Sequence, residues 1–131
     1  MSASSSLALQ TALYDAVTAA LPGVAVYDHV PPDAGFPYVT FGQAVTRDIG
    51  GAAAPLDEHT LQVFVWSRAE SRVEAAEKAE TVRAALETAA VSATGHAIVN
   101  RAVEQIDITR DPKTRIFRAQ LRLRAATEPT S

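Results

Sequence analysis

Three histidines, His29, His59 and His96, are the residues best suited to acid–base or metal chemistry. Two of them follow a carboxylate, Asp28 and Glu58, and such a neighbour can form part of an acid–base pair. A zinc site needs three or four ligands held together, yet these histidines have no short spacing and the chain has no cysteine. No nucleophile elbow, phosphate loop or dinucleotide-binding fingerprint is present. We therefore expect no catalytic residue, no metal ion and no cofactor.

A second group of residues is suited to binding anions, and it lies in the stretch RIFRAQLRLRAA at 115–126. Apolar and polar residues alternate strictly there, which is typical of a strand with one buried and one solvated face. Arg118, Arg122 and Arg124 would share the solvated face, and we call these three residues the arginine ladder. Like charges on one face repel each other. Asp107 can balance one of these charges, and Arg122 and Arg124 need water, a partner chain or a phosphate.

Two other segments could contact a partner. Glu70, Glu74, Glu77 and Glu80 form an acidic stripe at helical spacing, a pattern that most often marks a solvated surface. The segment 46–57 is rich in glycine and alanine without clear periodicity, which predicts a long mobile loop or an extended hairpin tip. Long loops in compact domains are often functional. We expect this one to reach a partner through Arg47, Asp48, Ile49, Gly50 and Gly51.

Charge is distributed unevenly along the chain. The net charge is −3, which argues against a dedicated nucleic-acid-binding protein. Residues from 101 onward include seven basic and four acidic side chains, whereas the first hundred include five and eleven. Such an asymmetry can steer copies of one chain toward each other. The sequence lacks a long apolar run and the features of a secretory signal, so we expect a soluble protein inside the cell.

Two helices and five strands are expected to position these residues. Apolar residues recur at helical spacing over 6–20 and over a second helix that ends near Ala90. We expect the second helix to follow a capping box made by Ser67 and Glu70. Strand patterns are found at 24–28, 38–45, 58–66, 97–110 and 115–125. The order α-β-β-β-α-β-β predicts an α+β domain, in which two helices pack on a mostly antiparallel sheet.

Three details of the strands can be predicted. Val39, Phe41 and Val45 would share one face, and the strand at 58–66 is apolar enough on both faces to be covered, at least partly, on both sides. A tight turn at 111–114, indicated by its Asp-Pro pair, would place Asp107 opposite Arg118 and Ile108 opposite Phe117. Glu104 would then fall on the apolar side, so a bulge or twist is expected near 102–104.

We expect a single domain over 1–131, with a flexible N-terminus at 1–5 and a tail at 127–131.

The ordered motifs resemble the tail-completion, or tail terminator, family of long-tailed phages, prophages and gene transfer agents. The resemblance extends from about residue 7 to residue 126. It is based on VYDHVPPDAGFPYVTFGQA at 26–44, on VWSR at 65–68, and on the Asp111-Pro112 turn before an arginine-rich strand. None of these motifs is a catalytic signature.

What the resemblance implies is structural. Family members form a six-membered ring on the head-proximal end of the tail tube, stop polymerisation of the tube and join the tail to head-completion proteins. We therefore expect a hexamer in a virion tail, assembled in the host cytoplasm. Its expected partners are the tail tube protein, a head–tail connector or head-completion protein, and DNA that passes through the central hole without sequence-specific binding. No membrane partner is implied.

Alternatives remain open from the sequence. A small α+β enzyme or ligand-binding domain would be favoured by a deep apolar pocket that holds a histidine–carboxylate pair. A single-strand nucleic-acid module would need aromatic residues among the arginines, but the final hairpin has Phe117 alone, on its buried face. The arginine ladder could either contact the acidic stripe of a neighbouring subunit or line the central hole, and we expect the contact with a neighbour.

Overall fold

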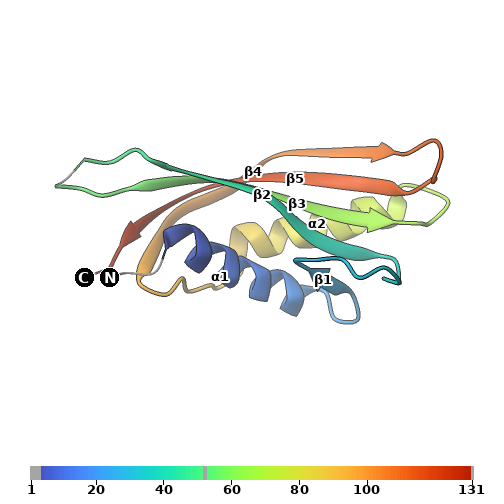
Figure 1. Ribbon diagram of the computed structural model, residues 1–131, viewed down its shortest axis with the longest axis horizontal. Helices are drawn as coiled ribbons and strands as arrows, with labels where there is room; N and C mark the ends of the chain where they lie inside the picture. The colour runs from blue at the N-terminus through green and yellow to red at the C-terminus, as the bar shows by residue number, and fades with distance from the viewer. Residues whose placement is uncertain (1–3, 52, 131) are drawn as a thin grey trace.

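Two helices cover one face of a five-stranded sheet, and α1 and α2 both lie on the same side of it (Figure 1). The computed structural model describes residues 4–51 and 53–130. In chain order the elements are α1 (Ser5–Ala20), β1 (Ala25–Tyr27), β2 (Tyr38–Asp48), β3 (Asp57–Ser67), α2 (Val73–Thr88), β4 (His96–Arg110) and β5 (Phe117–Pro129). The strand order is β1-β2-β3-β5-β4, and β1 alone runs parallel to its neighbour. The predicted α+β class and element order are confirmed.

The hydrophobic core lies between the sheet and the two helices. The central strands β3 and β5 point alternate residues into it, and Val63, Val65, Leu121 and Leu123 have no exposed surface. The helices contribute a second buried layer, which includes Leu9, Leu13, Val17, Val82 and Leu86. Full burial of an aliphatic side chain of this size contributes about 1.5–3 kcal/mol. The small residues Ala75 and Ala79 are also buried and allow α2 to approach the sheet closely.

The face of the sheet that points away from both helices is called the open face. On β3 it carries Thr60, Gln62, Phe64 and Trp66, which are half-buried by neighbouring side chains. The sequence predicts that this strand is covered at least partly on both sides. On the open face, within the described residues, that partial cover comes from side chains and not from a helix.

Strands β2 and β3 extend into the two ends of the segment predicted as a loop at 46–57. β2 continues to Asp48 and β3 begins at Asp57, with Arg47 opposite Glu58. The described residues between the two strands, 49–51 and 53–56, form the tip of the hairpin, where the amides of Ile49 and Gly50 both donate to the Leu56 carbonyl. Glycine is required at position 50, because a Cβ atom there would lie 2.2 Å from the Ala54 carbonyl oxygen. Of the two predicted forms, a mobile loop or an extended hairpin tip, the structure has the hairpin tip. Residues 46–48 have no periodicity of their own, but they pair with β3 and so continue the strand.

A bulge in β2 changes the face on which Val45 lies. Phe41 pairs with Val63, but the next pair is Ala44 with Leu61. The extra residue moves Val45 onto the open face, so the prediction that it shares a face with Val39 and Phe41 is wrong. Gly42 suits this bulge, since a Cβ atom there would lie 2.5 Å from the Phe64 ring.

The β4–β5 hairpin has a longer turn than the sequence predicted. The Asp111 amide donates to the Ile116 carbonyl, and the first strand pair is Arg110 with Phe117. Asp107 therefore faces Gln120 instead of Arg118, and Ile108 faces Ala119. A shift of two residues leaves the side chains of residues 105–110 on their predicted faces, because side chains alternate with a period of two.

The predicted bulge near 102–104 is confirmed. The register shifts between Val103 and Gln105. The extra residue, Glu104, reaches the open face and bonds to Arg124 there.

Both ends of the described chain are bound to the fold. The sequence predicts a flexible N-terminus over residues 1–5; in the structure Ser4 caps α1, and the Ser5 hydroxyl donates to the Asp57 carboxylate at 2.6 Å. At the other end β5 continues to Pro129 and Thr127 is buried, so the predicted tail is wrong for residues 127–129. Residues 1–3 and 131, which belong to the same predictions, lie outside the described residues.

The second helix begins later than predicted. β3 runs to Ser67 and α2 begins at Val73, with no side-chain hydrogen bond from its N-cap residue Arg72. The Ser67 hydroxyl accepts from the Ala69 amide and donates to the Glu74 carboxylate. A capping box with Glu70 is therefore wrong, because the chain needs residues 68–72 to turn from the sheet onto the helix.

The packing predicts the cost of truncating a residue of the central strand. Leu121→Ala should lower the free energy of unfolding by about 2–5 kcal/mol, since it leaves a cavity at a fully buried site. Urea denaturation measures this difference. Gln120→Ala, on the open face of the same strand, is the control and should change the free energy of unfolding far less. Equal effects of the two changes would contradict the assigned core.

Candidate functional site: the open face of the sheet

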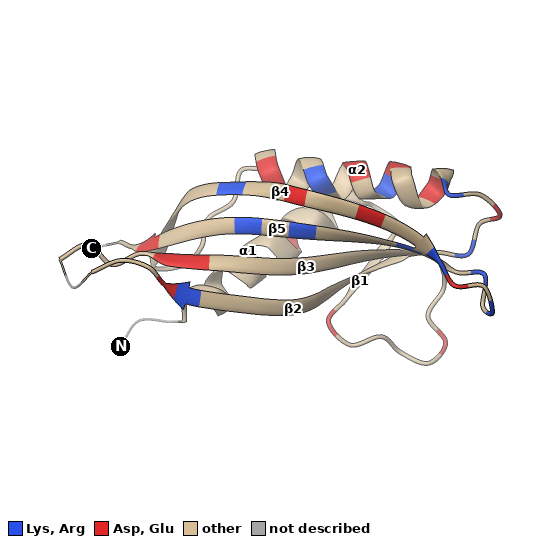
Figure 2. Ribbon diagram, turned by 90° about the horizontal axis from the view of Figure 1, so that it is seen from above, with Lys and Arg blue, Asp and Glu red and all other residues tan. Residues whose placement is uncertain are grey.

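The three arginines of the ladder lie along β5 on the open face, which Figure 2 views from above. Their neighbours across the strands differ. Arg118 pairs with Trp66 and Thr109, Arg122 with Gln62 and Gln105, and Arg124 with Thr60 and Ala102. The ladder therefore crosses from an aromatic end of the open face to a charged end.

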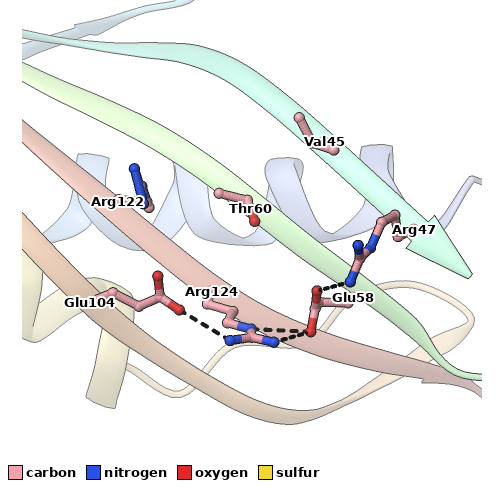
Figure 3. A pocket seen from close by; sticks show the side chains of 7 residues that line it. All are labelled: Val45, Arg47, Glu58, Thr60, Glu104, Arg122 and Arg124. Carbon is pink, nitrogen blue, oxygen red and sulfur yellow. Dashed lines mark hydrogen bonds and ion pairs between the residues drawn. The ribbon is translucent and has the colours of Figure 1, made fainter. Parts of the chain in front are cut away.

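Arg124 is held by carboxylates of its own chain. Its guanidinium bonds to Glu58 through two nitrogens, Nε at 3.1 Å and Nη2, and Nη1 lies 3.5 Å from Glu104 Oε1 (Figure 3). The other oxygen of Glu58 accepts from Arg47 at 3.1 Å. The hydrogen bonds from Arg124 lower the pKa of Glu58 and raise that of Arg124. Both partners of Arg124 thus come from flanking strands, and its charge is already balanced.

The other two arginines of the ladder have different surroundings. The Arg118 guanidinium lies over the Phe64 ring, 5.4 Å from its centroid. A cation over an aromatic face is stabilised by the ring's electron density. Arg122 is exposed, and within the described residues no carboxylate lies at ion-pair distance from it. Arg122 is therefore the member of the ladder whose charge is still available.

Aromatic side chains cluster at the other end of the open face. The Phe64 and Trp66 rings are 5.9 Å apart, and Tyr38 stacks on Trp66 at 6.2 Å. The Trp66 indole donates to the Thr40 hydroxyl at 2.9 Å, which fixes its orientation. The sequence signal for this cluster is that β3 carries the apolar residues Phe64 and Trp66 on the face opposite to its core residues. The single-strand nucleic-acid interpretation considered aromatics of the final hairpin alone and so missed these side chains.

Glu58 and Glu104 were missed as site residues, although the sequence contained a signal for each. Glu58 lies in β3 at the same alternation as Thr60 and Gln62, which places it on the open face with the ladder. Glu104 was the residue that conflicted with the predicted register, and the bulge resolves the conflict by turning it toward Arg124.

The acidic stripe lies on α2, on the opposite side of the molecule from the ladder. Glu77 and Glu80 are exposed, and Glu70 lies before the helix begins. Glu74 is half-buried, and its carboxylate accepts from the Ser67 hydroxyl at 2.7 Å. The exposed residues of α2 that recur at helical spacing are instead Val73, Glu77, Glu80, Ala84 and Thr88. The structure does not bring the ladder and the stripe together within one chain.

The residues of the predicted partner-contacting loop lie in and around the hairpin tip. Arg47 joins the ion pairs of the open face, and the Asp48 carboxylate accepts from the Gly50 amide at 3.1 Å. Ile49 is 46% exposed, which is unusual for so large an apolar side chain. Gly51 forms an isolated bridge with Ala54. Among these five residues Ile49 is therefore the apolar side chain that a partner could contact.

The histidines do not converge. Glu58 and His59 are adjacent in β3, so their side chains point to opposite faces and cannot act as an acid–base pair. His59 lies on the helix side, where Nδ1 is 2.9 Å from Thr46 Oγ1 and Nε2 is 2.8 Å from Thr127 Oγ1. His29 is exposed, and His96 begins β4.

Neither metal binding nor membrane insertion has support in the part of the chain that the structure describes. Within residues 4–51 and 53–130 no group of three or more histidine, aspartate or glutamate side chains is arranged to hold a metal ion. No helix of that part is long and apolar enough to cross a bilayer.

A sheet face that lacks helix cover and carries aromatic and charged side chains is typical of proteins that assemble with others. Comparison with known proteins agrees with this class. The sequence matches the family model described as "Tail completion protein gp17" over residues 8–128. The chain therefore belongs to the tail completion family, and it is a structural protein of the virion tail.

Solved structures contain the same fold. A chain of the structure entitled "Virion of native gene transfer agent (GTA) particle" superposes with a TM-score of 0.80 at 24% sequence identity. The match covers 97% of this chain and 99% of that one. The search of curated proteins found no match.

The position of His59 predicts a pH-dependent stability. Burial lowers the pKa of His59, and His96 lowers it further, whereas Asp57 opposes the shift. In the unfolded chain the histidine has its ordinary pKa of about 6.5, so the unfolded state binds the proton more tightly than the native state does. The stabilisation is therefore fully present above that value and is lost as the pH falls through it toward the native pKa. His59→Gln should flatten the dependence of the melting temperature on pH between about 7.5 and 5.5.

His29→Gln is the control for this measurement, because it removes an exposed histidine. It should leave the slope unchanged. An unchanged slope in His59→Gln would show that protonation of His59 does not destabilise the native state.

Proposed function

We propose that the protein is the tail terminator of its particle. Six copies form a ring on the head-proximal end of the tail tube, stop the tube from growing and join it to the head-completion proteins. The observation that carries this proposal is the family match, which extends over residues 8–128.

The arrangement of the two faces supports a ring. A closed ring of identical subunits is built from a heterologous contact, in which two different patches of the same chain meet. This chain has two chemically different faces, the open face with its arginines and the outer side of α2 with its glutamates. A protein with two unlike faces can repeat a head-to-tail contact without using the same patch twice.

Each expected partner contacts a different part of the protein or of the ring. The segment Arg47 to Gly51, which leads into the hairpin tip, contacts the tail tube protein or a neighbouring subunit, since the tip extends beyond the helices (Figure 1) and Ile49 is exposed. The opposite end of the ring meets the connector or head-completion protein. DNA passes through the hole without sequence-specific binding. In this function no residue is catalytic and no cofactor or metal ion takes part, and assembly takes place in the host cytoplasm.

Removing the protein from producing cells tests this function. Tails should then exceed their normal length and remain separate from heads, because nothing stops the tube or joins it to the head. Electron microscopy of the particles gives the distribution of tail lengths and the fraction joined to heads. Supplying the wild-type chain should restore both quantities. Joined tails of normal length in the absence of the protein would overturn the proposal.

A further inference from the structure

A groove on the charged end of the open face combines an apolar and a cationic side chain. It is lined by Val45 and Arg47 of β2, Glu58 and Thr60 of β3, Glu104 of β4, and Arg122 and Arg124 of β5 (Figure 3). Val45 is 45% exposed, and Arg122 is exposed as well. Three arginines face two glutamates in this groove, so its net charge is positive. Arg124 and Arg47 are bound by the glutamates, and Arg122 remains available to a partner.

The first turns of α2 present the complementary pair. Val73 is 54% exposed and Glu77 is exposed one turn later. Residues four apart on a helix lie side by side on its surface, so a valine and a carboxylate form one small patch. Between residues 70 and 80 four carboxylates face two cations, Arg72 and Lys78, which makes this end of α2 net negative.

We propose that Val73 and Glu77 of one copy dock into the groove at Val45 and Arg122 of the next copy. The inference rests on the proposed ring and names the surfaces that close it. Valine then packs on valine while the carboxylate of Glu77 reaches the guanidinium of Arg122. Removal of water by the apolar pair strengthens the neighbouring ion pair, because the local dielectric constant falls.

The occupant of the groove is a second copy of this chain. The signs of the two patches are opposite, and each joins one exposed valine to one charge. The patches lie on opposite sides of the sheet, so one molecule cannot satisfy its own groove. The contact is therefore heterologous and repeats from copy to copy, as a ring requires.

Charge exchange tests the pairing. Arg122→Glu and Glu77→Arg should each weaken ring formation at least tenfold, measured by the mass of the purified protein across a concentration series. The double variant should recover most of the loss, because the pair is restored with its signs reversed. The melting temperature of each variant shows whether the chain itself still folds. Tail length and head joining, after each variant replaces the wild type in producing cells, give a second readout.

A matched pair of variants tests the apolar part of the contact. Val73→Asp should disrupt ring formation, since it places a charge against Val45. Leu7→Asp is the control: Leu7 is 62% exposed on α1, outside both patches. Equal effects of these two changes would overturn the proposed docking.

The remaining outcomes separate this inference from the proposed function. If Arg122→Glu leaves the ring and the tail ends intact, the docking is wrong while the terminator function stands. If that variant assembles normally but delivers less DNA, Arg122 lines the hole and the docking is also wrong. If cells without the protein make joined tails of normal length, the terminator function fails, whatever the variants do.

Discussion

The pairing of β3 with β5 is the constraint on which the rest of the structure depends. These two strands lie at the centre of the sheet, and their inward residues are fully buried. Because side chains alternate along a strand, the register that sends Val63 and Leu121 into the core also sends Gln62 and Arg122 to the open face. The core therefore determines which arginines are displayed. A slip of one residue would bury the ladder and expose the core.

The same alternation explains how much of the molecule could be predicted from the sequence. The fold class and the faces of β3 and β5 follow from a strict period of two. The positions of Val45 and Glu104 depend on bulges, and a bulge was foreseen at Glu104 alone, where a charge conflicted with the pattern. The start of α2 and the order in residues 46–48 depend on contacts with distant segments, which local patterns do not contain. The sequence also contains no signal for which carboxylates reach which arginine.

The electrostatics of the open face differ from the sequence expectation in one respect. The sequence predicts that Asp107 balances Arg118 and that Arg122 and Arg124 need water, a partner chain or a phosphate, whereas in the structure Arg118 and Arg124 are both stabilised by other contacts within the chain. Arg124 is bound by Glu58 and Glu104, and Arg118 lies over Phe64. Exposed ion pairs of this kind add little to stability, but they hold side chains in fixed positions. As a result, Arg122 is the arginine of the ladder whose charge remains available to a partner. It lies between Arg124, whose charge is balanced, and the aromatic cluster.

A ring closes only when each copy adds the same rotation to the next. The charged residues of the proposed contact, Glu77 on α2 and Arg122 on β5, meet this condition because both elements are fixed by the core. α2 is anchored through Ala75, Ala79 and Val82, and Arg122 is between the buried Leu121 and Leu123. The angle between the patches is therefore set by packing of α2 against the central strands. The hairpin tip is different, because it extends beyond the helices (Figure 1). A contact made there can adapt to a partner of another shape, whereas a contact between α2 and β5 keeps the fixed geometry that closure demands.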